Sequence, residues 1–264
     1  MSTDRTKAHE ALRNTALACT ACPLATTRKQ VVFARGDPAA KLWLIGEGPG
    51  ADEDEQGKPF VGRAGQLLNK ILAAATINQD EVFITNTVLC RPPGNRVPTD
   101  EEITACSVHR NALLDLWKPP LVVLVGGTAA RTFLRGNKLA DLRGQRIERD
   151  GRIYYATFHP AYLLRDPSKK AVAWQDWQKI RDELRSLSGP DNPSGKSEAQ
   201  ELDRSVTKRL MPYIEQTVTT PKGTGRLVQV FNDRCGVVLD HDPRKVAFFH
   251  PSEIAEFIDE RQAG

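Results

Sequence analysis

Four short apolar runs, separated by segments of helical periodicity, constrain the fold of this 264-residue chain more than any other feature. The runs are at 42–45, 82–85, 121–125 and 153–158, and each has the length of a buried strand. Apolar side chains recur at helical spacing at 67–72, 103–117, 128–134 and 171–187. We therefore expect an α/β fold, a three-layer α/β/α sandwich around a central, mainly parallel four-stranded sheet. In such folds ligands bind at the carboxyl ends of the strands.

A segment rich in turn-forming residues divides the chain near residue 188. Residues 188–195 read Ser-Gly-Pro-Asp-Asn-Pro-Ser-Gly and contain no apolar residue, which is typical of a linker. We predict a main domain at 1–187, a linker at 188–205 and a small β-rich accessory domain at 206–264.

The predicted accessory domain differs from the rest of the chain in pattern and in charge. Its β-rich runs lie at 225–231, 235–239 and 246–249, with a closing helix at 252–258. These elements favour a small SH3-like β-barrel. Residues 1–187 carry a net charge of +6 and residues 188–264 one of −2, so the main domain is the better candidate for a polyanionic partner.

The sequence contains no run of 18 apolar residues, so we expect no membrane-spanning helix and no membrane partner. Residues 1–13 are polar and charged and have no apolar signal core, which predicts a cytoplasmic protein with reduced thiols. We also expect the protein to be monomeric.

Four of the five cysteines have the spacing of a metal site. Cys19 and Cys22 are separated by two residues, and Cys90 and Cys106 by fifteen, whereas Cys235 stands apart. A reducing compartment disfavours disulfides, but four buried apolar cysteines are an alternative. Four thiolates also suit zinc, although structural zinc sites more often pair two closely spaced cysteine knuckles. The spacing therefore predicts a metal centre and leaves the metal open.

Polar and flexible residues follow three of the predicted strands. Residues 46–50 read Gly-Glu-Gly-Pro-Gly, and their glycines let backbone amides approach a ligand closely. Asn86 follows the second strand and His159 the fourth. Taken singly, these are ordinary turn or structural residues. Because the carboxyl ends of parallel strands share one edge of the sheet, we expect them to converge on one site.

Four motifs occur in a fixed order around these positions. They are residues 46–50, residues 57–65 (Gly-Lys-Pro-Phe-Val-Gly-Arg-Ala-Gly), Thr85-Asn86 followed by Cys90-Arg91-Pro92-Pro93, and residues 159–165 (His-Pro-Ala-Tyr-Leu-Leu-Arg). Over about residues 15–187 the chain resembles the family 4 uracil-DNA glycosylases, the iron–sulfur branch of that superfamily. The resemblance implies a monofunctional enzyme that removes uracil from DNA, with uracil-containing DNA as its partner. It also implies a [4Fe-4S] cluster held by Cys19, Cys22, Cys90 and Cys106, with a structural role.

The resemblance implies individual roles in a pocket for a flipped-out base. Phe60 stacks on the base, and Asn86 pairs with O4 and N3–H of uracil, while cytosine leaves buried polar groups unpaired. His159 stabilises negative charge at O2 as uracil leaves, assisted by backbone amides of the first loop. The predicted substrate-binding residues are Gly46, Glu47, Gly48, Phe60, Asn86 and His159.

Gly48 stands where some branches of the superfamily place an aspartate that activates water. Glu47 precedes it and is the candidate for polarising the water, so His159 and Glu47 are the predicted catalytic residues. We expect a dissociative reaction, in which the glycosidic bond breaks first and a poorly activated water captures the sugar.

The residues after His159 are expected to contact DNA. By resemblance, Leu163 or Leu164 wedges into the space of the flipped nucleotide, and Arg165, Lys169 and Lys170 meet phosphates. A helix start with two core leucines is the alternative. Further phosphate candidates, with solvated surface as the alternative for each, are Arg63, Arg91 and Arg96.

Two alternatives concern other parts of the sequence. His250 lies in a second Phe-His-Pro, but His159 is preferred because it ends a predicted strand and continues as in the family. The rival function is a protein that binds uracil-containing or single-stranded DNA without turnover, or captures it covalently through an inserted histidine. No histidine lies between Cys90 and Cys106, which disfavours capture. For the accessory domain, a protein partner and groove positioning through Lys222 and Arg226 both stay open.

Overall fold

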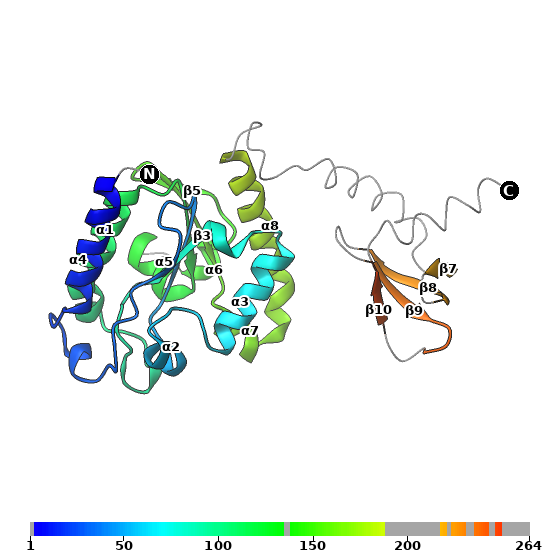
Figure 1. Cartoon of the computed structure of the whole chain (residues 1–264), viewed down its shortest axis with the longest axis horizontal. Coiled ribbons are helices and arrows are strands. Elements are labelled where there is room, and N and C mark those ends of the chain that lie inside the picture. Colours follow the sequence, from blue (N-terminus) through cyan, green and yellow to red (C-terminus); the bar gives the residue numbers. More distant parts are fainter. Residues whose placement is uncertain are drawn as a thin grey trace. The chain divides into compact units, whose positions relative to one another are not determined.

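The structure is a computed structural model that describes residues 3–134, 138–187, 217–220, 223–230, 235–242 and 246–249. The chain divides into two compact units, Met1–Gly189 and Pro190–Gly264 (Figure 1). The predicted linker at 188–205, the closing helix at 252–258, Lys222 and His250 lie outside the described residues. The exact division into domain, linker and accessory domain stays a prediction.

The first unit is built on a mixed sheet in the order β1-β3-β2-β4-β6-β5. Its strands are β1 (Arg35–Gly36), β2 (Leu42–Gly46), β3 (Val82–Asn86), β4 (Leu121–Val125), β5 (Ile147–Arg149) and β6 (Arg152–Thr157). The four predicted runs form β2, β3, β4 and β6, which pair in parallel. Every residue of β2, β3 and β4 is buried, because both faces of the sheet are covered.

The predicted number of four strands is wrong, because the sheet has six. β1 pairs antiparallel with β3, and β5 pairs antiparallel with β6. These edge strands have two and three residues, and their side chains are half-buried or exposed. Such short, partly solvated strands lack the apolar run that allows a strand to be predicted from the sequence.

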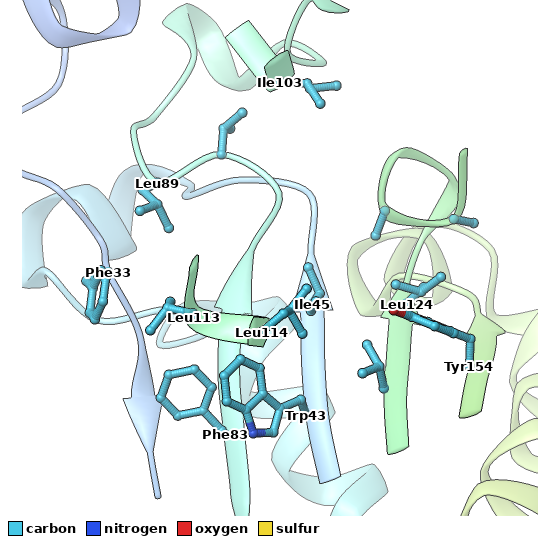
Figure 2. Close-up of a cluster of buried hydrophobic side chains, with 14 of the residues drawn as sticks. Phe33, Trp43, Ile45, Phe83, Leu89, Ile103, Leu113, Leu114, Leu124 and Tyr154 are labelled. Carbon is cyan, nitrogen blue, oxygen red and sulfur yellow. The ribbon is translucent and has the colours of Figure 1, made fainter. Parts of the chain in front are cut away.

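Helices cover both faces of the sheet, as expected for three layers. The helices are α1 (Thr3–Leu17), α2 (Ala51–Gln56), α3 (Arg63–Ala74), α4 (Asp100–Trp117), α5 (Gly127–Leu134), α6 (Leu139–Leu142), α7 (Pro160–Arg165) and α8 (Lys170–Leu187). One core cluster joins Trp43, Phe83 and Leu124 of the sheet to Leu113 and Leu114 of α4 (Figure 2). The cluster on the opposite face joins Leu44 and Val123 to α3 and α8 through the side chains Leu68, Leu72, Trp177 and Ile180. Within the described ranges, no helix is both long enough and apolar enough to cross a membrane.

The strand order creates an opening at the carboxyl edge of the sheet. From β2 the chain continues to β3 on one side, whereas from β4 it continues to β6 on the other side. The connections that leave the neighbouring strands β2 and β4 therefore diverge, which leaves a crevice beyond their carboxyl ends. Residues 46–50 and Gly126 follow these two strands and so lie at its edges.

The second unit contains an antiparallel sheet in the order β10-β9-β8-β7. Its strands are β7 (Thr217–Thr220), β8 (Gly223–Val230), β9 (Cys235–Leu239) and β10 (Val246–Phe249). Leu227, Cys235, Val237 and Phe249 are buried. The β-rich character is as predicted, although β7 was not expected, and closure into an SH3-like barrel stays a prediction.

Candidate active site

A cavity of about 540 Å³ lies at the carboxyl edge of the parallel strands. Five of the predicted substrate-binding residues line it: Glu47, Gly48, Phe60, Asn86 and His159. They come from separate segments, after β2, before α3, at the end of β3 and after β6. The expected convergence of strand ends is therefore present in the structure.

Gly46 does not line the cavity, but its lack of a side chain leaves room for two residues that do, Asn86 and Phe60. A Cβ atom at this position would lie 2.4 Å from Oδ1 of Asn86 and 2.7 Å from Cζ of Phe60. No side chain fits at such distances, so glycine lets the amide and the ring approach each other. Asn86 is only 2% exposed, and its amide is therefore held in place by close packing.

Phe60 is held in a backbone conformation that favours glycine. Its φ is +54°, in the left-handed region. Gly65 in α3 allows this, because a Cβ there would lie 1.9 Å from the carbonyl oxygen of Phe60. The rings of Phe60 and His159 have centroids 5.5 Å apart and are tilted by 32°. The strained loop thus places an aromatic face beside the predicted catalytic histidine.

Glu53 fastens together the two loops that hold these groups. One carboxylate oxygen, Oε1, accepts the backbone N–H groups of Val61 and Gly62 at 3.0 and 2.9 Å. The other, Oε2, accepts the N–H of Gly50 at 3.1 Å. Glu53 is three residues after Gly50 and closes the first turn of α2, so the 46–50 loop and the Phe60 loop share one anchor.

His159 is neutral at physiological pH. Burial, with a smaller effect from the positive charge of Arg165, lowers the pKa of His159 to about 4. Its Nδ1 accepts the backbone N–H of Ala161 at 3.2 Å. Because a neutral imidazole carries one proton, that proton resides on Nε2, and His159 has one N–H group to donate.

Glu47 is bound by a threonine of the neighbouring helix. The Thr128 hydroxyl, in the first turn of α5, donates a hydrogen bond to Oε2 of Glu47. Glu47 also lines the cavity, so this hydrogen bond holds a residue of the cavity wall.

The structure separates the two leucines that were considered as a DNA wedge. Leu163 is 1% exposed and packs inside the unit, whereas Leu164 is 37% exposed. The first turn of α7 directs Leu163 into the core, so Leu164 is the leucine that is accessible at the surface. Arg165 lines the cavity, and Lys169 lies in the short 3-10 turn Pro167–Lys169 that follows α7.

The four predicted metal ligands line one small pocket. Cys19, Cys22, Cys90 and Cys106 surround it, although the two pairs are far apart in the sequence. None of the cysteines forms a disulfide in the described part of the chain. Burial raises the pKa of Cys106 to about 11 and also raises that of Cys90.

Polar groups of the chain are directed at these sulfur atoms. Nη1 of Arg28 donates to Sγ of Cys90 at 3.2 Å, and the backbone N–H of Leu89 donates to Sγ of Cys106 at 3.4 Å. His109 also lines the pocket, and its buried Nε2 has no hydrogen-bond partner among the described residues. A buried polar atom without a partner is compatible with a bound group or a water beside it.

A three-residue segment connects the cysteine pocket to helix α2. Arg28 also donates to the carbonyl oxygen of Cys19 at 2.7 Å. The next two backbone N–H groups, of Lys29 and Gln30, donate to Oδ1 of Asp54 at 3.0 and 3.4 Å. Asp54 is 2% exposed and follows Glu53 directly. One turn of helix therefore contacts the loops of the cavity and the segment that follows Arg28 of the cysteine pocket.

Sequence reasoning missed several residues that shape these sites: Arg28, Glu53, His109 and Thr128. Thr128 carries a recognisable signal, since it follows the third parallel strand in Gly126-Gly127-Thr128, at the same edge as the other strand ends. Glu53 also has a recognisable signal, because it stands at the third position of α2, where a glutamate often accepts the N–H of the N-cap residue. Arg28 and His109 carry none, because the cysteine pocket that both line is assembled from segments that are distant in the sequence.

Comparisons with known proteins agree with this arrangement. The family model described as the uracil DNA glycosylase superfamily matches residues 33–180. A type-4 uracil-DNA glycosylase of Thermotoga maritima is 41% identical over 168 residues, which cover 62% of this chain and 88% of the relative. A type-4 uracil-DNA glycosylase of Pyrobaculum aerophilum is 38% identical over 184 residues, which cover 66% of this chain and 91% of the relative. The chain therefore belongs to the uracil-DNA glycosylase superfamily, within its type-4 family.

Proposed function

We infer that this protein excises uracil from DNA by hydrolysing the N-glycosidic bond, which releases free uracil and leaves an abasic site. The observation that carries this conclusion is the convergence of Phe60, Asn86 and His159 on one cavity. The names of the type-4 relatives support the same activity. A base inside a duplex is inaccessible, so the nucleotide flips out into the cavity.

Base recognition falls to Phe60 and Asn86. The ring of Phe60 offers a face on which the base stacks. The amide of Asn86 has both a donor and an acceptor and pairs with O4 and N3–H of uracil. Cytosine presents an amino group and an unprotonated N3 at the same edge, so the buried amide would lose its partners and cytosine is rejected.

His159 stabilises the leaving group. As the glycosidic bond breaks, negative charge develops on the pyrimidine, and Nε2–H of the neutral imidazole donates to O2. The contact between Nδ1 and the Ala161 N–H fixes both the tautomer and the ring. The donor is therefore preorganised, which lowers the barrier because no reorientation is needed in the transition state. Glu47 orients the water that captures the sugar.

Leu164 and the basic residues after it bind the DNA around the flipped nucleotide. Leu164 is the exposed member of the leucine pair and fills the space that the nucleotide leaves. Arg165 and Lys169 meet phosphates, and binding should weaken with added salt.

The cysteine pocket holds a [4Fe-4S] cluster through Cys19, Cys22, Cys90 and Cys106. Three observations support the fit: the four thiols line one pocket, two N–H groups donate to their sulfur atoms, and the buried Nε2 of His109 lacks a partner. Structural zinc sites more often pair two closely spaced cysteine knuckles, so the fifteen residues between Cys90 and Cys106 favour a four-iron cluster, which takes one cysteine at each iron. The bound cluster supplies a rigid cross-link and no step of the hydrolysis.

The decisive experiment measures free uracil released from a uracil-containing oligonucleotide under single-turnover conditions. We expect release by the wild-type protein and a rate about 10²–10³-fold lower for His159→Gln. His241→Gln is a matched control, since His241 is exposed in the second unit. Binding of the oligonucleotide without release, or a covalent protein–DNA adduct, would contradict the proposed function.

A further inference from the structure

Behind the cavity wall, a pair of hydrogen bonds leads from an arginine through a threonine to Glu47. Nη1 of Arg131 donates to the hydroxyl oxygen of Thr128 at 3.0 Å. The same hydroxyl contacts Oε2 of Glu47. A guanidinium group can only donate, so Arg131 binds to a lone pair of the Thr128 oxygen. The hydroxyl hydrogen of Thr128 is then available to donate to the carboxylate of Glu47. The direction of both hydrogen bonds is therefore fixed by the chemistry of the three groups.

The position of Thr128 suits a supporting role better than contact with substrate. Thr128 is 3% exposed and does not line the cavity, whereas Glu47 does. The two residues follow β4 and β2, which are adjacent parallel strands, so the sheet fixes their spacing. Thr128 is therefore rigid and touches Glu47 from behind.

We propose that Thr128, supported by Arg131, is a positioning residue for Glu47. It binds Oε2, so Oε1 is the oxygen presented to the cavity, where it accepts a hydrogen bond from the water that attacks the sugar. This inference rests on the proposed function of the cavity and adds the residue that makes Glu47 effective.

The electrostatics of the cavity explain why Glu47 needs such support. Arg165 lines the same cavity, and an untethered carboxylate would be attracted to its guanidinium, whereas Arg96 is already paired with Glu102. Pairing with Arg165 would turn the carboxylate away from the water. A hydrogen bond to an ionised acceptor is among the stronger ones in proteins and is sufficient to hold the productive orientation.

Thr128→Val tests the proposal, because valine keeps the shape of threonine and removes the hydroxyl. We expect the single-turnover rate of uracil release to fall roughly tenfold, with little change in KM. Thr128→Ser, which restores the hydroxyl, should stay within about threefold of wild type. Thr132→Val is the matched control, because the Thr132 hydroxyl donates only to the carbonyl oxygen of Thr128, at 2.8 Å.

A double-mutant cycle separates positioning from a general packing effect. In a Glu47→Ala background, Thr128→Val should cause no further loss of rate, since its target is gone. Arg131→Gln, at an exposed position, gives a second route to the same answer if Thr128→Val is poorly folded. We expect about a threefold loss for Arg131→Gln in wild type and none in Glu47→Ala.

Two results would overturn the proposal. One is an unchanged rate in Thr128→Val, and the other is the same loss with and without Glu47. Failure of the proposed function would look different, because the wild-type protein itself would then release no uracil.

Discussion

The cavity at the carboxyl edge of the sheet, called the base cavity below, and the cysteine pocket both use residues at or after the end of β3. They differ in how their polar groups are hydrogen-bonded. Asn86 of the cavity and Cys90 of the pocket are four residues apart. In the cavity, the chain itself supplies the partners: Ala161 for His159, Thr128 for Glu47 and Glu53 for both loops. In the pocket, Arg28 and the Leu89 N–H donate to two sulfur atoms, but burial still raises the pKa of the Cys90 and Cys106 thiols, and the Nε2 of His109 has no partner among the described residues.

This difference shows which site needs something from outside the chain. A cavity whose polar groups are already held is preorganised and changes little when the base enters. The proposed cluster would complete the second site, because it would take up the four thiolates and fill the space beside the unpaired Nε2 of His109. The first site should therefore be sensitive to the chain's own anchors and the second to the proposed cluster.

The largest effect is expected from removing a ligand of the cysteine pocket. Cys106→Ala should abolish iron binding and lower the free energy of unfolding of the first unit by about 4–5 kcal/mol or more. Iron content, visible absorbance and thermal unfolding measure these changes.

Cys235→Ala makes the same substitution at a buried cysteine of the second unit and serves as the control. It should keep the iron and cost about 1–2 kcal/mol within its own unit. Wild-type protein that is colourless and contains zinc when purified without air would show that the cofactor assignment is wrong.

A smaller effect is expected at the anchor of the base cavity. Glu53→Gln replaces one acceptor oxygen by an NH₂ group that faces a backbone N–H, so we expect a loss of about 2–3 kcal/mol in stability. The rate of uracil release should fall by about tenfold, because the Phe60 loop loses its support.

Glu55→Gln makes the same change two residues along α2, at an exposed position paired with Lys29. It should leave both the rate and the stability near wild type. Equal effects of the two substitutions would mean that Glu53 does not anchor the loops.

The smallest effect concerns the neutral histidine. In the unfolded chain His159 takes up a proton near its ordinary pKa of 6.5, but in the folded chain only near 4. Between these values the unfolded state binds more protons, so stability falls as the pH falls from 6.5 towards 4. From pH 7 to pH 5, wild type should lose about 1–2 kcal/mol more than His159→Gln.

Urea unfolding of both proteins at the two pH values measures this difference. Burial also lowers the pKa of His9 and of His109. Both residues are present in wild type and variant, so their contributions to the pH dependence cancel in the comparison. Identical pH losses in wild type and variant would show that His159 is not held neutral.

The sequence predicted the parallel core and the convergence of strand ends, because both follow from local patterns. Continuous apolar runs mark β2, β3 and β4, and residues after parallel strands share one edge. It failed where the decisive contact is non-local. Periodicity could not separate Leu163 from Leu164, which are adjacent and chemically alike, and nothing in residues 35–36 or 147–149 marks an edge strand.

Helix α2 joins the loops of the base cavity to the segment that leads from the cysteine pocket. Glu53 holds the loops of the base cavity and the adjacent Asp54 holds the segment from the cysteine pocket, within a helix of only six residues. Suppose that DNA and the group in the cysteine pocket both stabilise this helix when they bind. Each must then strengthen the binding of the other, by the same free energy in both directions. A uracil-containing oligonucleotide would then slow the removal of the bound group by a chelator.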